Sequence, residues 1–263
     1  MNSAFWASSS GRVLNIVLVL LGAALLWEAS VAVFHVKAFI LPPPSAVIKE
    51  LFAEPGYYLS NAAYTVYETL LGFIAAVALG IVMAIAVVYS KWVENILYTL
   101  LVAINSVPKV AVAPLFILWL GTGLEPKVAI AFMIAVFPII ISTVLGLRSI
   151  DPDMLDLASS LKGTRSQTLW KIRVPNALPG MFSGMKVGIS FAFIGSIVGE
   201  FVAASQGLGF VIVTSTANFD TTHTFAALIL LTLIGTILFY GIEFLERKML
   251  PWHVSHRKTT AIV

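Results

Sequence analysis

Six long stretches of apolar residues follow one another along the chain, separated by short polar segments. Each has about the length, roughly 20 residues, that an α-helix needs to cross a hydrocarbon layer. They are apolar on every side, whereas strands of a membrane β-barrel alternate apolar and polar positions. The pattern therefore predicts an all-α, polytopic membrane protein with about six transmembrane helices, at residues 13–34, 62–89, 96–120, 127–147, 177–203 and 225–249.

Two of these runs have special features. The first is longer than the apolar core of a secretory signal, which spans about 7–15 residues, so we expect it to be retained as a membrane anchor. Pro108 and Pro114 interrupt the third run. A proline inside a helix removes a hydrogen bond and bends the helix. The third run should therefore form either one kinked helix or two shorter ones.

The composition agrees with a membrane protein. The chain has 263 residues, of which 59% are hydrophobic and 11% are charged, whereas soluble domains carry about 25% charged residues. Six helices leave little chain for a second domain, so we expect one transmembrane domain over residues 1–263.

Charge and cysteine content exclude some functions. A net charge of +3 gives no concentrated basic face, which excludes nucleic-acid binding as the main role. Cysteine is absent, so disulfides and thiolate metal sites are impossible.

The basic residues predict the orientation, because positively charged loops near helix ends stay in the cytoplasm. An even number of crossings places both termini on one side. If that side is cytoplasmic, the opposite side receives only Lys37, Lys49 and Lys127. The cytoplasmic side receives Arg12, Lys91, Arg148, Lys162, Arg165, Lys171, Arg173, Arg247, Lys248, Arg257 and Lys258. We therefore expect both termini in the cytoplasm.

The longest cytoplasmic connection, residues 148–176, has the pattern of two short helices. Asp151 is a good N-cap and Pro152 suits the first helical position. Met154, Ala158 and Leu161 then form one apolar face. Such a face needs a cover, which lipid headgroups or a groove on a partner protein would provide.

A second helix follows in the same connection. Gly163 offers a break, and Thr164 with Gln167 forms a capping box that starts the next helix. We expect that helix to end near Arg173, because Pro175 disfavours helical geometry in the residue before it.

This connection resembles the cytoplasmic signature of bacterial ATP-binding-cassette (ABC) importer permeases, in which a coupling helix docks on an ATPase subunit. The matching pieces are 156–158, 162–163 and 172–175, and their spacing fits without insertion or deletion. Lys162 occupies the position of the usual glycine, and Gly163 could supply the turn instead. The resemblance implies an ATPase-coupling role for Asp156, Leu157, Ala158, Leu161, Lys162, Gly163, Thr164, Arg165, Ile172 and Pro175.

The resemblance extends over residues 41–209. The proline-rich segment 41–45, the segments 108–115 and 118–123, and Glu200 followed by Gly207-Leu208-Gly209 are similar to the subgroup that imports nitrate, sulfonate and taurine. This similarity implies a small polar solute, with an organic anion such as a sulfonate or taurine favoured over nitrate or a heterocyclic vitamin precursor.

The chain has no phosphate-binding loop of the Gly-x-x-x-x-Gly-Lys-Ser/Thr type. We therefore expect no enzyme activity and no cofactor bound by this chain, with ATP and Mg²⁺ held by a partner. The family resemblance implies ABC ATPase subunits, a second permease copy in a homodimer, and an external solute-binding protein. It also implies a bacterial plasma (inner) membrane location, with lipid as a further contact.

Several ionisable residues lie in or near the apolar runs, where a charge is costly unless it is paired or near water. Lys109, close to Asn105 and Ser106, is a candidate for attracting an anionic solute. Glu200 is either a solute contact or a gate that orders the external loop. The predicted solute pathway therefore consists of Asn105, Ser106, Lys109 and Glu200. Other residues of this kind, which structural roles can explain, are Glu28, Glu68, Lys186 and Glu243.

Two further patterns concern a metal site and helix packing. His253 and His256 have metal-ligand spacing but lack a third ligand, so we expect no metal site. Small residues recur every four positions in 72–84 and in 180–192, which indicates close packing either inside the chain or against a second subunit.

Two other functions remain as alternatives. An ion-coupled secondary transporter would use the buried Glu and Lys residues as a relay. An intramembrane hydrolase would need Ser190 activated by Lys186.

Overall fold

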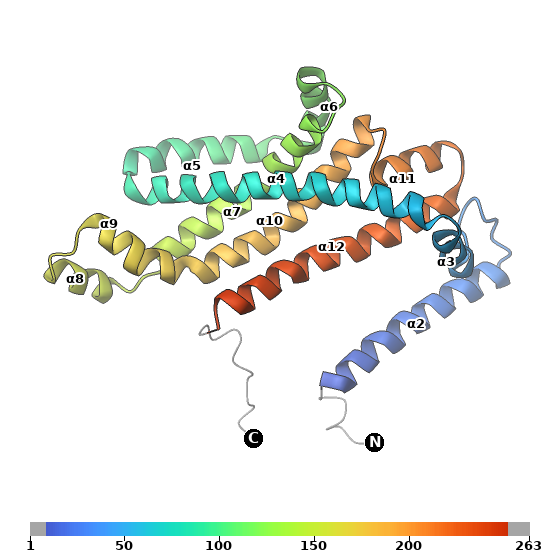
Figure 1. Cartoon of the computed structure of the whole chain (residues 1–263), viewed down its shortest axis with the longest axis horizontal. Coiled ribbons are helices and arrows are strands. Elements are labelled where there is room, and N and C mark those ends of the chain that lie inside the picture. Colours follow the sequence, from blue (N-terminus) through green and yellow to red (C-terminus); the bar gives the residue numbers. More distant parts are fainter. Residues whose placement is uncertain (1–8, 252–263) are drawn as a thin grey trace.

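The computed structural model describes residues 9–251, and within this range every regular element is a helix, which confirms the all-α class. Figure 1 shows long helices lying roughly along one direction, with short helices at both ends. The elements are α2 (Ser9–Val33), α3 (Pro44–Ala53), α4 (Pro55–Tyr89), α5 (Lys91–Ser106), α6 (Lys109–Leu120), α7 (Glu125–Arg148), α8 (Pro152–Ser160), α9 (Arg165–Thr168), the π-helical turn η1 (Leu169–Arg173), α10 (Val174–Ala203), α11 (Leu208–Ala217) and α12 (Thr221–Met249).

Four helical segments of the described chain are long and apolar enough to cross a membrane: α4, α7, the continuous segment Arg165–Ala203, and α12. The predicted count of six is therefore not confirmed. The third apolar run forms two helices, because Pro108 is the N-cap of α6 and separates it from α5. At 12 residues, α6 is about 18 Å long, which is too short to span a bilayer.

The helix that starts at Arg165 does not end near Arg173, so that prediction was wrong. It passes through the π-helical turn η1, in which the Val174 N–H donates to the Leu169 carbonyl oxygen, and continues as α10. Pro175 lies in the first turn of α10. A π-helical turn spaces the preceding carbonyls differently from an α-turn, and the chain accommodates the proline without a break.

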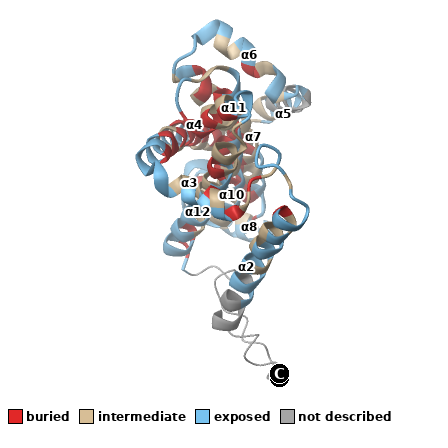
Figure 2. Cartoon of the chain, turned by 90° about the vertical axis from the view of Figure 1, so that its right-hand side faces the viewer, coloured by how far each residue is buried: buried red, intermediate tan, exposed pale blue. Residues whose placement is uncertain are grey.

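Helix α7 lies between α4 and α10, at distances that only small residues permit. A Cβ atom at Gly72 of α4 would lie 2.6 Å from the Ala131 Cβ, and one at Gly188 of α10 would lie 2.7 Å from the Ile139 Cδ1. Both predicted small-residue patterns therefore pack against α7 inside the chain. Figure 2 shows the buried residues gathered on these helices, and the core here consists of Phe73, Ala76, Ala131, Ala135, Ile139, Ile189 and Ala192.

Helix α2 is attached to the other helices mainly at one end, and Figure 1 shows most of its length standing apart. Glu28 accepts hydrogen bonds from the Ser45 N–H (3.0 Å) and hydroxyl (2.7 Å) in the first turn of α3. The Trp27 ring lies 5.5 Å from the Phe225 ring of α12. Leucines elsewhere on α2 are exposed, including Leu25 and Leu26, so the protein itself does not cover this apolar helix.

We predict that Gly72→Ala lowers the free energy of unfolding by about 1–3 kcal/mol, because the added methyl group has no space between α4 and α7. The thermal unfolding midpoint of the purified protein in detergent measures this loss. Gly241→Ala is the matched control, since no atom lies within 4 Å of a Cβ at that position. An equal midpoint for both variants would contradict the close packing of α7.

Candidate functional site

The helical elbow, defined as residues 151–175, starts with a capped helix as predicted. The Asp151 Oδ1 accepts a hydrogen bond from the Asp153 N–H at 3.0 Å, and Pro152 occupies the first helical position of α8. The carboxylate thus pairs with an N–H group that has no partner within the helix. This bond fixes where α8 begins.

The turn after α8 is closed by two backbone hydrogen bonds. The Gly163 N–H donates to the Ala158 carbonyl at 2.9 Å, and the Lys162 N–H donates to the Ser159 carbonyl at 2.9 Å. This is the Schellman arrangement that ends many helices. Its left-handed residue is Lys162, with a φ of +53°, so Gly163 does not supply the turn conformation. Gly163 is instead needed for space, because a Cβ there would lie 2.9 Å from the Ala158 carbonyl oxygen.

The predicted capping box opens α9. The Thr164 N–H donates to the Gln167 Oε1 at 2.9 Å, and the Gln167 N–H donates to the Thr164 Oγ1 at 3.2 Å. Local hydrogen bonds therefore fix where each of the two helices of the elbow begins.

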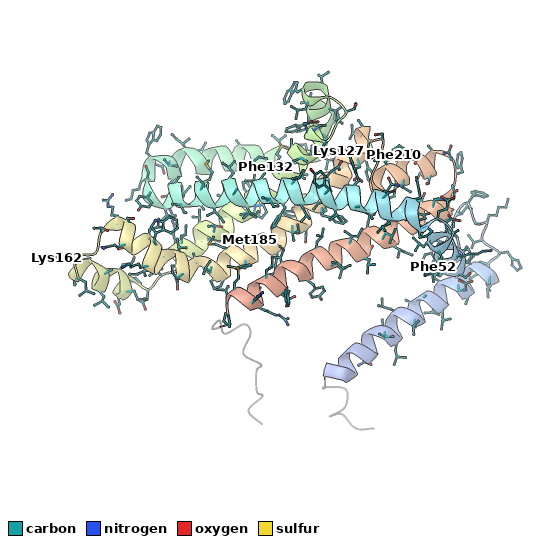
Figure 3. The ribbon with its side chains drawn as sticks, viewed as in Figure 1. Phe52, Lys127, Phe132, Lys162, Met185 and Phe210 are labelled. Atoms are coloured by element: carbon teal, nitrogen blue, oxygen red, sulfur yellow. The ribbon has the colours of Figure 1, made fainter. Side chains whose placement is uncertain are left out.

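Large apolar side chains of the elbow point away from the protein. Leu157 is 61% exposed, Leu161 is 75% exposed, and Trp170 is 60% exposed. Figure 3 labels Lys162 at the tip of the elbow, far from the packed helices. Asp156 and Arg165 are also exposed, whereas Ala158 and Ile172 are partly buried. Most of the predicted coupling residues are therefore exposed in this chain.

The opposite end of the helices contains a buried charged pair that the sequence did not predict. Lys127 at the start of α7 is 2% exposed and its Nζ lies 2.8 Å from the Glu68 Oε1 of α4, which is fully buried. The same Nζ lies 4.8 Å from the Tyr64 ring centroid, a distance at which the ring face attracts a cation. The sequence places Lys127 on the external side, at the start of an apolar run, and the structure shows that its side chain is buried.

Glu200 of α10 belongs to the same buried group and holds the start of α11. Its Oε2 accepts a hydrogen bond from the Gly209 N–H and its Oε1 accepts one from the Thr65 hydroxyl, both at 2.6 Å. Glu200 is 2% exposed. A carboxylate at a helix N-terminus is favourable because the N–H groups there are unpaired and point outward.

The glycine before α11 has a conformation that other residues rarely adopt. Gly207 has a φ of +109°, and a Cβ there would lie 2.2 Å from the Glu200 Oε1. The Gly207 N–H donates to the Asn61 Oδ1 at 2.8 Å, and the Leu208 N–H donates to the Thr65 Oγ1 at 2.9 Å. The sequence pattern of Glu200 followed by Gly207 and Gly209 is therefore explained by the hydrogen bonds that order this loop.

Four polar residues of this group were missed by sequence reasoning: Asn61, Thr65, Thr69 and Ser196. Thr69 and Ser196 bond to each other across α4 and α10 at 2.7 Å. The available signal was the spacing of Asn61, Thr65 and Thr69, which places polar residues on one face of an apolar helix. Together with Glu68 they form a polar stripe that faces α7, α10 and α11.

Of the four predicted solute-pathway residues, the structure describes the side chains of Lys109 and Glu200. Lys109 begins α6, and its Nζ lies 5.7 Å from the Phe137 ring centroid, whereas Glu200 belongs to the buried group near α11. The side chains of Asn105 and Ser106 lie outside the described residues. A role of these four residues in solute transport stays a prediction.

The remaining membrane-depth charges have partners in the structure. The Lys186 Nζ of α10 pairs with the Glu246 Oε2 of α12 at 2.8 Å. The Ser190 hydroxyl donates to the Lys186 carbonyl oxygen rather than to a base. This geometry does not favour the hydrolase alternative.

Within residues 9–251 no group of three potential metal ligands occurs. His253 and His256 lie outside the described residues.

Comparison with known proteins shows the class of protein to which this chain belongs. The family described as "binding-protein-dependent transport system inner membrane component" matches residues 76–251. The chain therefore belongs to this family of ABC importer permeases.

Individual relatives agree with this assignment. The chain is 36% identical to a riboflavin transport system permease protein of Chloroflexus aurantiacus over 87% of this chain and 86% of that protein. It is 28% identical to the taurine transport system permease protein of Escherichia coli, over 86% and 85% of the two chains. A solved amino acid ABC transporter has a similar fold, with a TM-score of 0.62 over 76% of this chain and 95% of that chain, at 14% identity.

We predict that Lys127→Met destabilises the protein by about 3–5 kcal/mol, because it leaves the Glu68 carboxylate buried without a counter-charge. This corresponds to a fall in the thermal midpoint of roughly 10 °C. Adding Glu68→Gln to the same chain should recover more than half of the loss, since the uncompensated charge is then removed. A double variant that is as unstable as the sum of the two single variants would contradict the ion pair.

Proposed function

We propose that the helical elbow faces the cytoplasm and docks in a cleft of an ABC ATPase subunit. The observation that carries this proposal is the exposure of Leu157, Leu161 and Trp170 on a segment whose two helices are capped internally. An exposed apolar helix face costs free energy in water, and a partner groove that covers it turns this cost into binding energy. The local caps hold the face in shape before the partner arrives.

The continuous helix Arg165–Ala203 gives the elbow a direct connection to the far end of the protein. At about 1.5 Å per residue it extends for nearly 60 Å. Its far end carries Glu200, which holds the start of α11. Movement of the elbow by the ATPase would therefore reposition α11 and the helices around it. ATP can drive such a change only if it binds one arrangement of the subunits more strongly than the other.

This function requires partners. ATP and Mg²⁺ would be bound by two ATPase subunits, and two copies of this chain would form the pathway between them. A solute-binding protein would deliver solute at the α3–α11 end. The exposed apolar faces of α2 and α12 fit contact with lipid in a bacterial plasma membrane, with both termini in the cytoplasm. Membership in a family of binding-protein-dependent permeases supports this assembly over an ion-coupled secondary transporter.

We predict that Gly163→Pro and Ala158→Glu uncouple ATP hydrolysis from solute uptake, reducing uptake at least tenfold while the protein stays in the membrane. The proline removes the N–H that closes the turn at Ala158, and the glutamate places a large charged side chain at a partly buried position. Uptake and ATPase activity are measured in vesicles containing the assembled transporter. Ser160→Ala, an exposed substitution in α8, is the control. Normal coupled uptake in both elbow variants would refute the docking role.

The proposed solute is a small organic anion such as a sulfonate or taurine, and Lys109 would attract it. Relatives named for riboflavin and for taurine transport show that the family handles different small polar solutes. Lys109 is partly exposed at the start of α6, beside the break at Pro108.

We predict that Lys109→Ala lowers uptake of an anionic solute at least fivefold more than uptake of a neutral one, because it removes a charge that attracts only the anion. Initial uptake rates at saturating binding protein provide the comparison. Lys37→Ala, on the segment between α2 and α3, is the matched charge control. If both solutes lose the same fraction of uptake, Lys109 supports the structure and does not select charge.

A further inference from the structure

A cavity of about 680 Å³ lies between the elbow and the ends of α4, α5 and α7. Four basic residues line it: Lys91 and Arg148 from the helix ends, and Arg165 and Arg173 from the elbow. Among the described residues that line it, Glu94 is the only acidic one. The cavity, which we call the basic cavity, therefore has a surplus of positive charge on walls that come from two regions far apart in sequence, residues 87–94 and 148–173.

The surplus charge is not neutralised by the described protein. Glu94 pairs with Arg148 at 2.8 Å, and the Arg173 guanidinium donates to the Leu147 carbonyl oxygen at 3.2 Å. Within residues 9–251 no carboxylate lies within ion-pairing distance of Lys91 or Arg165. Cationic side chains that converge on a cavity without counter-charges favour an anion there.

The chemistry of the walls narrows the class of anion. Guanidinium groups match the geometry of phosphate oxygens and can bind them through two hydrogen bonds. The Ser159 and Thr168 hydroxyls also line the basic cavity and can donate to the same oxygens. Val87 and Leu155 form an apolar part of the wall, which suits the carbon atoms of an ester attached to the phosphate.

We infer that the basic cavity binds the phosphate group of an anionic ligand, and the apolar wall favours an anionic phospholipid headgroup over free inorganic phosphate. This inference rests on the proposed function for one point, namely that the elbow end faces the cytoplasm at the membrane surface. Basic pockets between helices at that surface are suited to anionic headgroups. The exposed Trp92 beside Lys91 fits the same interface.

A ligand in the basic cavity would connect the elbow to the start of α5, two parts of the chain that share few other contacts. Lys91 lies at the start of α5 and Arg165 at the start of α9. A phosphate bound by both would hold the elbow against the helix ends. The ligand would thereby stabilise the elbow in the position from which it docks on the ATPase.

The test measures retention of phosphatidylglycerol by the full-length protein in phosphatidylcholine nanodiscs, using native mass spectrometry and the thermal midpoint. The protein should retain phosphatidylglycerol and gain stability as its fraction rises. The double variant Lys91→Gln/Arg165→Gln should bind about tenfold more weakly, because it removes two charge-assisted contacts. Lys171→Gln is the matched control, since Lys171 is exposed on the same elbow but does not line the basic cavity.

A second set of samples replaces phosphatidylglycerol with inorganic phosphate. Stabilisation by phosphate alone, lost in the double variant, would support the phosphate site and assign its source to the soluble anion. Equal retention of phosphatidylglycerol by the wild type and the double variant would overturn the inference. Because binding is measured on this chain without the ATPase, it is independent of transport, so a failure of ATPase docking would appear separately in the uptake assay.

Discussion

The close packing of α7 between α4 and α10 is the contact on which the positions of both functional ends depend. Lipid tails are as apolar as leucine, so membrane helices gain little by burying apolar surface against each other and rely on close contact. Gly72 on α4 and Gly188 on α10 let both helices approach the α7 backbone. The helices are therefore fixed in register, and the elbow at one end and the buried charges at the other keep constant positions relative to each other.

The buried charges make that register specific. The Lys127–Glu68 pair joins α7 to α4, and Thr65 with Glu200 joins α4 to α10 and α11. A shift of one helix by a single turn would separate these partners and leave charges buried without compensation, at a cost of several kcal/mol. Apolar contacts alone tolerate such shifts better. The glycines permit more than one arrangement of the helices, and the buried charged and polar residues select one of them.

Much of the elbow could be predicted from the sequence because its structure is local. The Asp151 cap and the Thr164–Gln167 capping box depend on residues two or three positions apart, and both were found as expected. The apolar runs likewise predicted the helical class. The sequence suggested that Gly163 could supply the turn, yet Lys162 is the residue with the left-handed conformation. Its position in the Schellman motif decides the conformation, even though a side chain makes it less favourable.

Features that depend on distant segments could not be predicted in the same way. Lys127 follows Pro126 at the start of a helix, and no local pattern indicates that it pairs with Glu68, which lies 59 positions earlier. Continuation of the helix through Pro175 depends on a π-helical turn, which no local pattern indicated. The side of α4 that faces α7 could be inferred from its small residues, but not the identity of the helix that it contacts.

The most direct test of the account is the accessibility of a single cysteine at Leu157, which is feasible because the chain has no cysteine of its own. The Leu157→Cys variant is treated with a membrane-impermeant maleimide in intact cells and in inside-out vesicles, with and without the ATPase subunits. If the elbow faces the cytoplasm and docks on the ATPase, labelling occurs only in inside-out vesicles and is at least tenfold slower when the ATPase is bound. Labelling from outside intact cells, or equal rates with and without the ATPase, would contradict it.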